Sequence, residues 1–392
     1  MSFSLASTSR HLLSKTGSCS SATTCYSSFA HAMIVPGPRS LHSGVVTPAS
    51  ASSSNGQGLK QKILMMDEII LAKKDYADLA SRYEMIPLSS KTREEFIQDC
   101  ASEKKYASVE GMYRHFKGAS TKVTGRFDHE LVQALPKKLK FVTHNGAGYD
   151  QIDIPSCTSR HIQVSNVPVV VDDATADTAL FLLLGSLRQF GLAQTSLRSG
   201  TFNTDLKLSH DPRGKVLGII GMGGIGRAFA KRCKSLGMEL KYHNRNRLEE
   251  ELEAGAIYVA NMEELLKTSD VVSINVPLNP KTHHLIGAKE FKMMKSSSIL
   301  INTSRGPVVD ETALVEALEK GEIAGCGLDV YEFEPKIHEG LLKSEKAFLL
   351  PHVGTLTYET QEEMEAVCLR NLKQGLETGK LGFTVPEQKG QF

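Results

Sequence analysis

The sequence lacks the features that would identify a membrane-spanning, disulfide-stabilised or nucleic-acid-binding protein. No apolar run approaches the roughly 20 residues that a membrane-spanning helix needs. The net charge is only +2, so no global basic field attracts nucleic acid. The seven cysteines include no CxxC pair and no Cys/His cluster at zinc spacing, which indicates scattered reduced thiols. We therefore expect no nucleic-acid partner, no membrane association and no metal.

Acidic residues are missing from the start of the chain, where the first one is Asp67. Residues 1–58 are rich in Ser, Thr and Ala, and their positive charge comes from Arg10, Lys15 and Arg39. An acid-free, Ser-rich and basic segment is typical of an organelle transit peptide. We expect a transit-like segment and a mitochondrial location, with a disordered tail and a cytoplasmic location as the alternative.

The whole chain of 392 residues is 41% hydrophobic and 23% charged, which is typical of a globular protein. Its length is enough for two or three domains. From residue 59 onward, short apolar runs alternate with helical stretches, which predicts an α/β protein with parallel sheets. Residues 62–66 predict a strand, residues 94–101 a short helix, and residues 139–150 a strand that runs into a Gly-rich loop. Residues 102–128 have too few periodic apolar positions for an assignment.

Residues 172–197 predict one long helix that connects two domains. Asp172 or Asp173 can cap its N-terminus. Apolar residues occupy nearly its whole circumference, so we expect it to be buried between packed layers. A turn at residues 210–215 then leads to a second α/β unit at Val216. The predicted fold is α/β, with two Rossmann-like or flavodoxin-like parallel-sheet domains and the active site in the cleft between them.

Residues 216–244, VLGIIGMGGIGRAFAKRCKSLGMELKYHN, place a GxGxxG turn between a predicted strand and a predicted helix. Gly221 permits the tight bend, Gly223 lets a pyrophosphate approach the backbone, and Gly226 lets the helix pack closely on the strand. The N-terminus of the helix then presents free N–H groups to the phosphates. Gly237 ends the helix as a left-handed cap would. This complete strand–helix–strand context predicts a dinucleotide site.

The stretch YHNRNRL at residues 242–248 follows the second strand of this unit. An acidic residue at the end of that strand would bind the adenosine ribose and repel a 2′-phosphate. Asn244 occupies the position here and is followed by Arg245 and Arg247, whose guanidinium groups suit phosphate. We predict a preference for NADP(H), with NAD(H) still possible. A solvated basic loop is the alternative.

Three later stretches each place a polar side chain at or near the end of a predicted strand. Arg305 follows the strand of SSSILINTSRG, Asp329 lies inside the strand of GLDV, and His352 ends the strand of FLLPH. Asp329, inside an apolar strand, would be a buried carboxylate that needs a partner, and Glu334 lies in the loop after it. Asp310 can cap the helix that follows Arg305. Because open α/β sheets bind ligands at the carboxyl ends of their strands, we expect these residues to converge on one crevice.

These stretches resemble the D-isomer-specific 2-hydroxyacid dehydrogenase family. GMGGIGRAFAKR, INTSRGPVVD, LDVYEFEP and LLPHVG occur in the family's order, and the resemblance covers residues 60–392. HNGAGYDQID at residues 144–153 resembles the family's substrate loop, and YHNRNRL is most similar to the glyoxylate/hydroxypyruvate reductases. The resemblance implies an NAD(P)H-dependent reductase of a small 2-oxo acid, glyoxylate or hydroxypyruvate, that forms a homodimer.

The resemblance also implies a domain organisation and a role for individual residues. Residues 59–167, completed by residues 353–392, would form the substrate domain, and residues 168–352 the dinucleotide-binding domain. The implied catalytic residues are Arg305, Glu334 and His352. The implied substrate contacts are Asn145, Gly146, Ala147, Gly148, Arg305 and His352. The implied cofactor contacts are Thr175, Gly221, Gly223, Gly224, Ile225, Gly226, Asn244, Arg245, Arg247, Pro277, Thr282, Thr303 and Asp329.

Physical chemistry supports the three catalytic roles. Hydride delivery to a ketone creates an alkoxide, so a proton donor such as His352 must lie within hydrogen-bond reach. A carboxylate such as Glu334 favours the imidazolium and orients the ring. A fixed guanidinium such as Arg305 can hold a 2-oxo acid through two hydrogen bonds while it polarises the carbonyl.

The identity of the substrate stays open at this stage. A D-specific dehydrogenase for a bulkier 2-oxo acid is a nearby alternative, because Lys117 and Gly118 stand where the family often has a substrate-side arginine. A corepressor-like protein, which binds the dinucleotide and acts through protein partners, is a more distant alternative. Turnover would distinguish it from an enzyme.

Two clusters of polar residues, a histidine pair and an acidic run, are expected to have no functional role. His283 and His284 have no carboxylate or cysteine at ligand spacing, so we expect no metal there. The acidic run EEELE at residues 249–253 is expected to be a solvated helix face.

Overall fold

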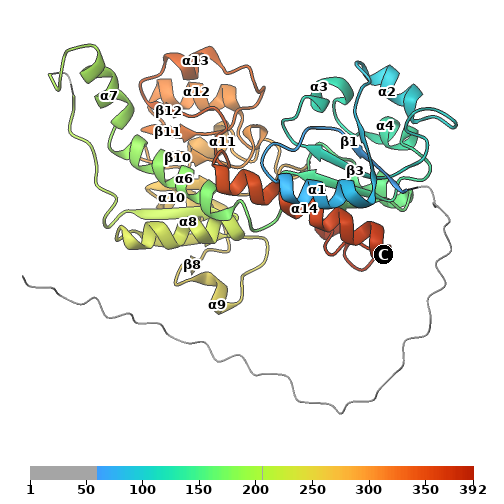
Figure 1. The fold of residues 1–392 in the computed structure, drawn as a ribbon. Helices are drawn as coiled ribbons and strands as arrows, with labels where there is room; N and C mark the ends of the chain where they lie inside the picture. Colours follow the sequence, from blue (N-terminus) through green and yellow to red (C-terminus); the bar gives the residue numbers. More distant parts are fainter. Residues whose placement is uncertain (1–59, 205) are drawn as a thin grey trace, which may run out of the picture. The chain divides into compact units, whose positions relative to one another are not determined.

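The computed structural model describes residues 60–204 and 206–392, so the predictions for residues 1–58 lie outside the described residues. Within the described part of the chain, no helix combines the length and the apolar character needed to span a bilayer. The five cysteines in this part are free and buried. The described residues form two parallel sheets with helices on both faces of each (Figure 1).

The first sheet has five parallel strands in the order β2-β1-β3-β4-β5, which is the flavodoxin-like order. Its strands are β1 (Lys62–Met65), β2 (Glu84–Pro87), β3 (Val109–His115), β4 (Phe141–Asn145) and β5 (Gln163–Ser165). Its helices are α1 (Lys73–Arg82), α2 (Arg93–Cys100), α3 (Ser120–Thr124), α4 (His129–Ala134), α5 (Ile154–Ser159) and α14 (Tyr358–Thr378). The C-terminal helix α14 packs against α1, β3 and β4, so the two ends of the described chain meet on this sheet (Figure 1).

The second sheet has seven parallel strands in the order β12-β11-β10-β9-β6-β7-β8, the Rossmann order extended by one strand. Its strands are β6 (Val216–Ile220), β7 (Glu239–His243), β8 (Ile257–Tyr258), β9 (Val271–Ile274), β10 (Ile299–Asn302), β11 (Gly325–Leu328) and β12 (Ala347–Leu349). Its helices are α6 (Asp172–Leu187), α7 (Phe190–Arg198), α8 (Gly224–Ser235), α9 (Glu250–Glu253), α10 (Met262–Thr268), α11 (Ala288–Phe291), α12 (Glu311–Lys320) and α13 (Glu339–Lys343). The predicted fold class is confirmed.

Local sequence signals explain several of these elements. Strand β6 spans the predicted residues, and α8 ends before Gly237, which has the left-handed φ of 74° expected of its cap. Asp310 caps α12 as predicted, because its side chain accepts a hydrogen bond from the N–H of Ala313 at 2.9 Å. The buried faces of α6 and α8 pack against each other. Leu182 of α6 and Phe229 of α8 belong to the same apolar core.

Two predictions along the chain were wrong, and one stretch without an assignment contains regular structure. The single helix expected over residues 172–197 is two helices, because Gln189 adopts a left-handed conformation between α6 and α7. Neither Asp172 nor Asp173 caps α6, since Val171 stands at the N-cap position and no side-chain cap bond is present. Residues 102–128, left unassigned, contain the central strand β3 and the short helix α3.

The strand ends also differ from the prediction. Asp329 follows β11 instead of lying within it, and His352 lies in the turn beyond β12 with a left-handed φ of 57°. Glu253, expected on a solvated face, is buried and accepts a hydrogen bond from the Tyr242 hydroxyl at 2.7 Å. The charge run alone could not reveal this partner, because Tyr242 belongs to another element.

Candidate active site

The carboxyl ends of the strands surround one crevice of about 650 Å³. The loops after β4 and β3 of the first sheet face those after β9, β10, β11 and β12 of the second sheet. This is the position at which open α/β sheets bind ligands. The predicted site residues that line the crevice are Gly146, Ala147, Gly148, Thr175, Ile225, Pro277, Thr303, Arg305, Asp329 and His352.

His352 and Glu334 form the titratable pair of the crevice. Nδ1 of the imidazole lies 2.8 Å from Oε2 of Glu334 and 3.1 Å from its Oε1. Burial acts to raise the pKa of Glu334, but its hydrogen bond and charge interaction with His352 prevail and hold that pKa below its ordinary value. Glu334 therefore stays ionised and can favour the imidazolium. The Phe116 ring packs at 5.6 Å from the imidazole and covers it from the first sheet.

Asp329 holds the backbone on which His352 is mounted. Its two carboxylate oxygens accept hydrogen bonds from the N–H groups of Val353 at 2.7 Å and Gly354 at 2.9 Å. These bonds supply the partner that a buried carboxylate requires, although burial still raises the pKa of Asp329 above its ordinary value. The left-handed backbone at His352 is uncommon for a side-chain-bearing residue, and this clamp on the next two residues helps to hold it.

Arg305 extends into the crevice from the end of β10. Its Nε donates to Oδ1 of Asp150 at 2.8 Å, and its Nη1 donates to the Ser304 carbonyl at 2.8 Å. A Cβ on Gly148 would lie 1.9 Å from Nη2 of Arg305, so the guanidinium lies directly against that glycine. The sequence prediction gave Asp150 no role, although it lies within the predicted loop of residues 144–153, and it fixes the guanidinium from the other sheet.

The loop after β4 presents two backbone donors. Among residues 60–204 and 206–392, the N–H groups of Ala147 and Gly148 have no hydrogen-bond acceptor. The N–H of Gly146 donates to the His144 carbonyl at 3.0 Å, so its predicted role as an anion donor does not fit. Asn145 is fully buried, its Nδ2 donates to the Tyr113 hydroxyl at 2.8 Å, and its role as a substrate contact stays a prediction.

The glycine turn has the geometry of a dinucleotide site. Gly221 has a φ of 97°, and a Cβ there would lie 2.7 Å from the Asn275 carbonyl oxygen. A Cβ on Gly226 would lie 2.4 Å from the carbonyl oxygen of Gly221, whereas a Cβ on Gly223 would meet open space. Gly223 therefore leaves room for a phosphate at the N-terminus of α8.

Further residues of the second sheet fit a nicotinamide dinucleotide. Oγ1 of Thr303 is buried at the crevice and has no partner among the described residues. Thr175 lines the crevice from the first turn of α6. Thr282 does not line it; its hydroxyl donates to the Pro277 carbonyl at 2.6 Å and shapes the loop that does. A Cβ on Gly224 would meet Asp172 at 2.0 Å, so that glycine serves helix packing.

The three predicted cofactor residues of the basic loop after β7 make different contacts. Oδ1 of Asn244 accepts a hydrogen bond from the N–H of Met222 at 2.7 Å and so ties the loop to the glycine turn. Arg247 donates to Glu253 through Nε at 2.7 Å and Nη2 at 3.1 Å, which largely neutralises its charge. Arg245 is exposed and has no hydrogen bond among the described residues. Both arginines were predicted to bind a 2′-phosphate, and of the two only Arg245 has its guanidinium free of a side-chain partner among the described residues.

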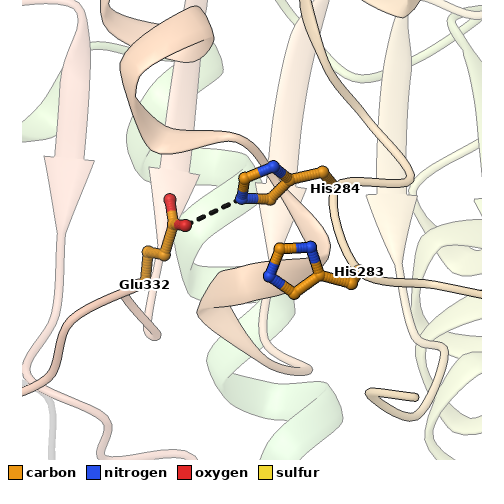
Figure 2. Close-up of side chains that lie close together, drawn as sticks. All are labelled: His283, His284 and Glu332. Atoms are coloured by element: carbon orange, nitrogen blue, oxygen red, sulfur yellow. Dashed lines mark hydrogen bonds and ion pairs between the residues drawn. The ribbon is translucent and has the colours of Figure 1, made fainter. Parts of the chain in front are cut away.

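His283 and His284 do have a carboxylate beside them, contrary to the sequence prediction. Nε2 of His284 lies 2.7 Å from Oε1 of Glu332, and the two imidazole rings lie 4.1 Å apart (Figure 2). The other oxygen of Glu332 accepts a hydrogen bond from the N–H of Glu311 at 3.2 Å. Glu332 is thus already bonded through both oxygens, and the contacts anchor the loop that carries Glu334.

The comparisons with known proteins agree with this geometry. Residues 180–354 match the model of the D-isomer specific 2-hydroxyacid dehydrogenase, NAD binding domain. The chain is 50% identical over 329 residues to 4-methyl-2-oxopentanoate reductase A of Aspergillus oryzae, covering 84% of this chain and 99% of that protein.

Two solved structures are similar over nearly their whole length. A glyoxylate reductase from Paecilomyes thermophila has a TM-score of 0.81 and 48% identity, covering 84% of this chain and 99% of its own. An NADPH-dependent glyoxylate/hydroxypyruvate reductase from Sinorhizobium meliloti, in complex with NADP and malonate, has a TM-score of 0.73 and 30% identity, covering 84% and 97%. This chain therefore belongs to the D-isomer specific 2-hydroxyacid dehydrogenase family, and it is a nicotinamide-dinucleotide oxidoreductase that reduces 2-oxo acids to 2-hydroxy acids.

Proposed function

We propose that this protein reduces the small 2-oxo acids glyoxylate and hydroxypyruvate with NADPH as the preferred reductant. One observation carries the proposal: a guanidinium, two free backbone N–H groups and an imidazole–carboxylate pair all face the same crevice. A 2-oxo acid offers a carboxylate and a carbonyl oxygen, and these are the groups that such donors recognise. Two of the similar structures are a glyoxylate reductase and a glyoxylate/hydroxypyruvate reductase.

In the proposed mechanism, each residue acts on one atom of the substrate. The free N–H groups of Ala147 and Gly148 bind the carboxylate, and Arg305 bridges the carboxylate and the carbonyl oxygen. The bound nicotinamide supplies the hydride to the carbonyl carbon. His352 donates its proton to the carbonyl oxygen as negative charge develops there, and Glu334 stabilises the imidazolium before the transfer. The product is the 2-hydroxy acid.

The NADPH preference rests on the loop after β7. Asn244 leaves no carboxylate to repel a 2′-phosphate, and the exposed guanidinium of Arg245 is available to bind it. The Sinorhizobium meliloti structure contains NADP, which agrees with this preference. NADH remains an expected but poorer reductant.

A bulkier, apolar 2-oxo acid is the second candidate substrate. Several apolar side chains line the crevice near the carboxylate loop, namely Phe116, Ile152, Ile154 and Met364. Glyoxylate has no side chain that could contact them, whereas a branched aliphatic chain could. The 50% identical relative bears the name of a 4-methyl-2-oxopentanoate reductase.

We also propose a homodimer through α6, α7 and the segment that follows them. Large apolar side chains are exposed there, namely Phe181, Phe190, Leu197, Phe202 and Leu208. Contiguous exposed apolar patches mark protein interfaces, and we propose that these side chains form one. Light scattering of the purified protein should give twice the monomer mass of 42.8 kDa, and Phe202→Glu should shift it toward one monomer.

A mitochondrial location is proposed from the Ser-rich, acid-free composition of residues 1–58. Fusing these residues to a fluorescent protein should direct it to mitochondria. A diffuse signal would favour the cytoplasmic alternative.

A steady-state assay tests the proposed function. Glyoxylate, hydroxypyruvate and 4-methyl-2-oxopentanoate are each offered with NADPH and with NADH. The largest kcat/KM is expected for a small acid with NADPH. A larger kcat/KM for the branched acid would select the second candidate, and nucleotide binding without turnover would favour a partner-binding role.

A further inference from the structure

Arg114 is the largest fully buried side chain in the described part of the chain. It lies on β3, with none of its surface exposed, and it contacts His144 and Gln151 of β4 and the loop that follows. Burying a guanidinium costs free energy unless it is paired and hydrogen-bonded. Burial lowers the pKa of Arg114 to about 10, so it stays charged near neutral pH. The free-energy cost of burying this charge indicates that Arg114 has a role beyond packing.

No carboxylate pairs directly with Arg114 among the described residues. Its Nη2 donates to Oε1 of Gln151 at 2.9 Å, its guanidinium stacks over the Phe127 ring at 4.7 Å, and its Nε has no partner. The acids Asp67 and Asp150 act on it only at a distance. Its charge is therefore not cancelled locally.

The remaining contact of Arg114 fixes the tautomer of His144. Nη1 of Arg114 lies 3.3 Å from Nδ1 of His144, and a guanidinium can only donate. Nδ1 must therefore accept, so the ring proton resides on Nε2. Nε2 lies 3.0 Å from the Gly148 carbonyl and donates to it. Burial, followed by the charge of Arg114, holds the pKa of His144 well below its ordinary value, so the ring remains neutral.

This chain of donors ends in the loop that faces the substrate. The bond from His144 fixes the Gly148 carbonyl, and with it the peptide that joins Gly148 to Tyr149 directly after the two free N–H groups. Gln151 makes a second connection, since its Nε2 donates to the Phe116 carbonyl at 3.2 Å in the loop after β3 of the same sheet. Hydrogen bonds in a chain polarise one another, so the charge of Arg114 strengthens the bond that holds the Gly148 carbonyl.

We propose that Arg114 is a positioning residue for the substrate carboxylate. Through His144 and Gln151 it holds the loop of residues 146–150, so that the free N–H groups of Ala147 and Gly148 face the anion. The negative charge of the bound carboxylate then balances the positive charge of Arg114, which no carboxylate among the described residues pairs with directly. The inference rests on the proposed function, because it needs the loop to bind the carboxylate. It assigns no contact between Arg114 and the substrate.

The test compares Arg114→Met with the wild type in two assays. We expect KM for the 2-oxo acid to rise about 10- to 100-fold, the range of one charge-assisted hydrogen bond, while kcat changes less than about 3-fold. The dissociation constant of oxamate, an unreactive 2-oxo acid analogue, should rise by the same factor on the NADPH-loaded enzyme. NADPH affinity should not change. Arg114→Lys should recover part of the loss.

His144→Gln is the second variant, and it decides the outcome if Arg114→Met does not fold. Glutamine is also a neutral donor and acceptor, but its amide atoms lie at other positions than the ring nitrogens. KM for the 2-oxo acid and the dissociation constant of oxamate should therefore rise again, while NADPH affinity stays the same. Unchanged oxamate affinity in a folded variant, or equal losses in kcat and NADPH affinity, would overturn the inference. A wild type that binds oxamate but reduces no 2-oxo acid would instead contradict the proposed function.

Discussion

Nδ1 of His352 lies 2.8 Å from Oε2 of Glu334, and the two residues come from loops that follow neighbouring parallel strands. The pair leaves Nε2 of the imidazole as the ring atom available to a ligand in the crevice. Asp329 clamps the backbone just beyond His352, so the ring has a fixed position before any substrate binds. Such preorganisation is what proton transfer in a transition state requires.

His352→Gln removes the proton donor. We expect kcat to fall about 10²- to 10⁴-fold, because general acid catalysis contributes that range. NADPH affinity, measured by fluorescence titration, should stay the same. A variant with more than a third of the wild-type kcat would contradict the assignment.

Glu334→Gln removes the charge that favours the imidazolium. Because the low pKa of Glu334 keeps it ionised in the wild type, its effect on His352 is present throughout the neutral range. In the variant, the decline of the reduction rate with rising pH should begin at a lower pH. A rate profile in pH steps from 5 to 9 checks this, and an unshifted profile would show that Glu334 does not act on His352.

Two glycine substitutions should fail in different ways. In Gly148→Ala the new Cβ displaces the flexible end of Arg305, so we expect little change in thermal stability but a large loss of kcat/KM for the 2-oxo acid. In Gly226→Ala the Cβ meets the rigid backbone of Gly221, so stability and NADPH affinity should fall. Melting curves and KM values for both substrates distinguish the two. Loss of NADPH affinity in Gly148→Ala would count against the description of the crevice.

Arg245→Ala and Arg247→Ala form a matched pair. Losing a charged hydrogen bond to a 2′-phosphate should raise KM for NADPH about 10- to 100-fold in Arg245→Ala, with KM for NADH unchanged. Arg247→Ala should change KM for NADPH much less but lower the melting temperature, because the buried Glu253 loses its charged partner and keeps only the Tyr242 hydroxyl. The reverse order of the two KM effects would reassign the phosphate contact to Arg247.

The neutral His144 makes stability depend on pH. Its pKa in the folded protein lies well below the ordinary 6.5, because of burial and then the Arg114 charge, whereas the unfolded chain binds a proton near that pH. The unfolded state therefore gains protons first, and the free energy of unfolding should fall by up to about 1.4 kcal/mol per pH unit below pH 6.5 from this residue.

Urea denaturation at pH 7.5, 6.5 and 5.5 measures this slope. His144→Gln should show a shallower slope than the wild type over the lower interval, since it cannot take up the proton. Equal slopes would mean that His144 is protonated in the folded protein, which would also remove its acceptor for Arg114.

The sequence predicted the elements that depend on local signals. The glycine turn at Gly221, the caps at Asp310 and Gly237 and the strand before the turn all follow from residue type and spacing. The polar residues after the strands converge because parallel strands share one carboxyl edge. The fold class followed from the same alternation of strands and helices.

Residues whose partners lie far along the chain could not be predicted. Asp150 meets Arg305 across 155 positions, and Arg114 looks like an ordinary charge within MYRH until the fold buries it. Glu332 is 48 residues from His284, so no spacing rule connects them. The break at Gln189 depends on a left-handed residue for which the sequence offers no glycine.

The most direct test of the central claim couples turnover to product configuration. The purified chain is incubated with NADPH and hydroxypyruvate, NADPH oxidation is followed by absorbance, and the glycerate formed is resolved by chiral chromatography. We predict one D-glycerate for each NADPH oxidised and, with His352→Gln, glycerate formation about 10²- to 10⁴-fold slower. NADPH binding without glycerate formation, or an L product, would contradict a D-specific 2-oxo acid reductase built on this crevice.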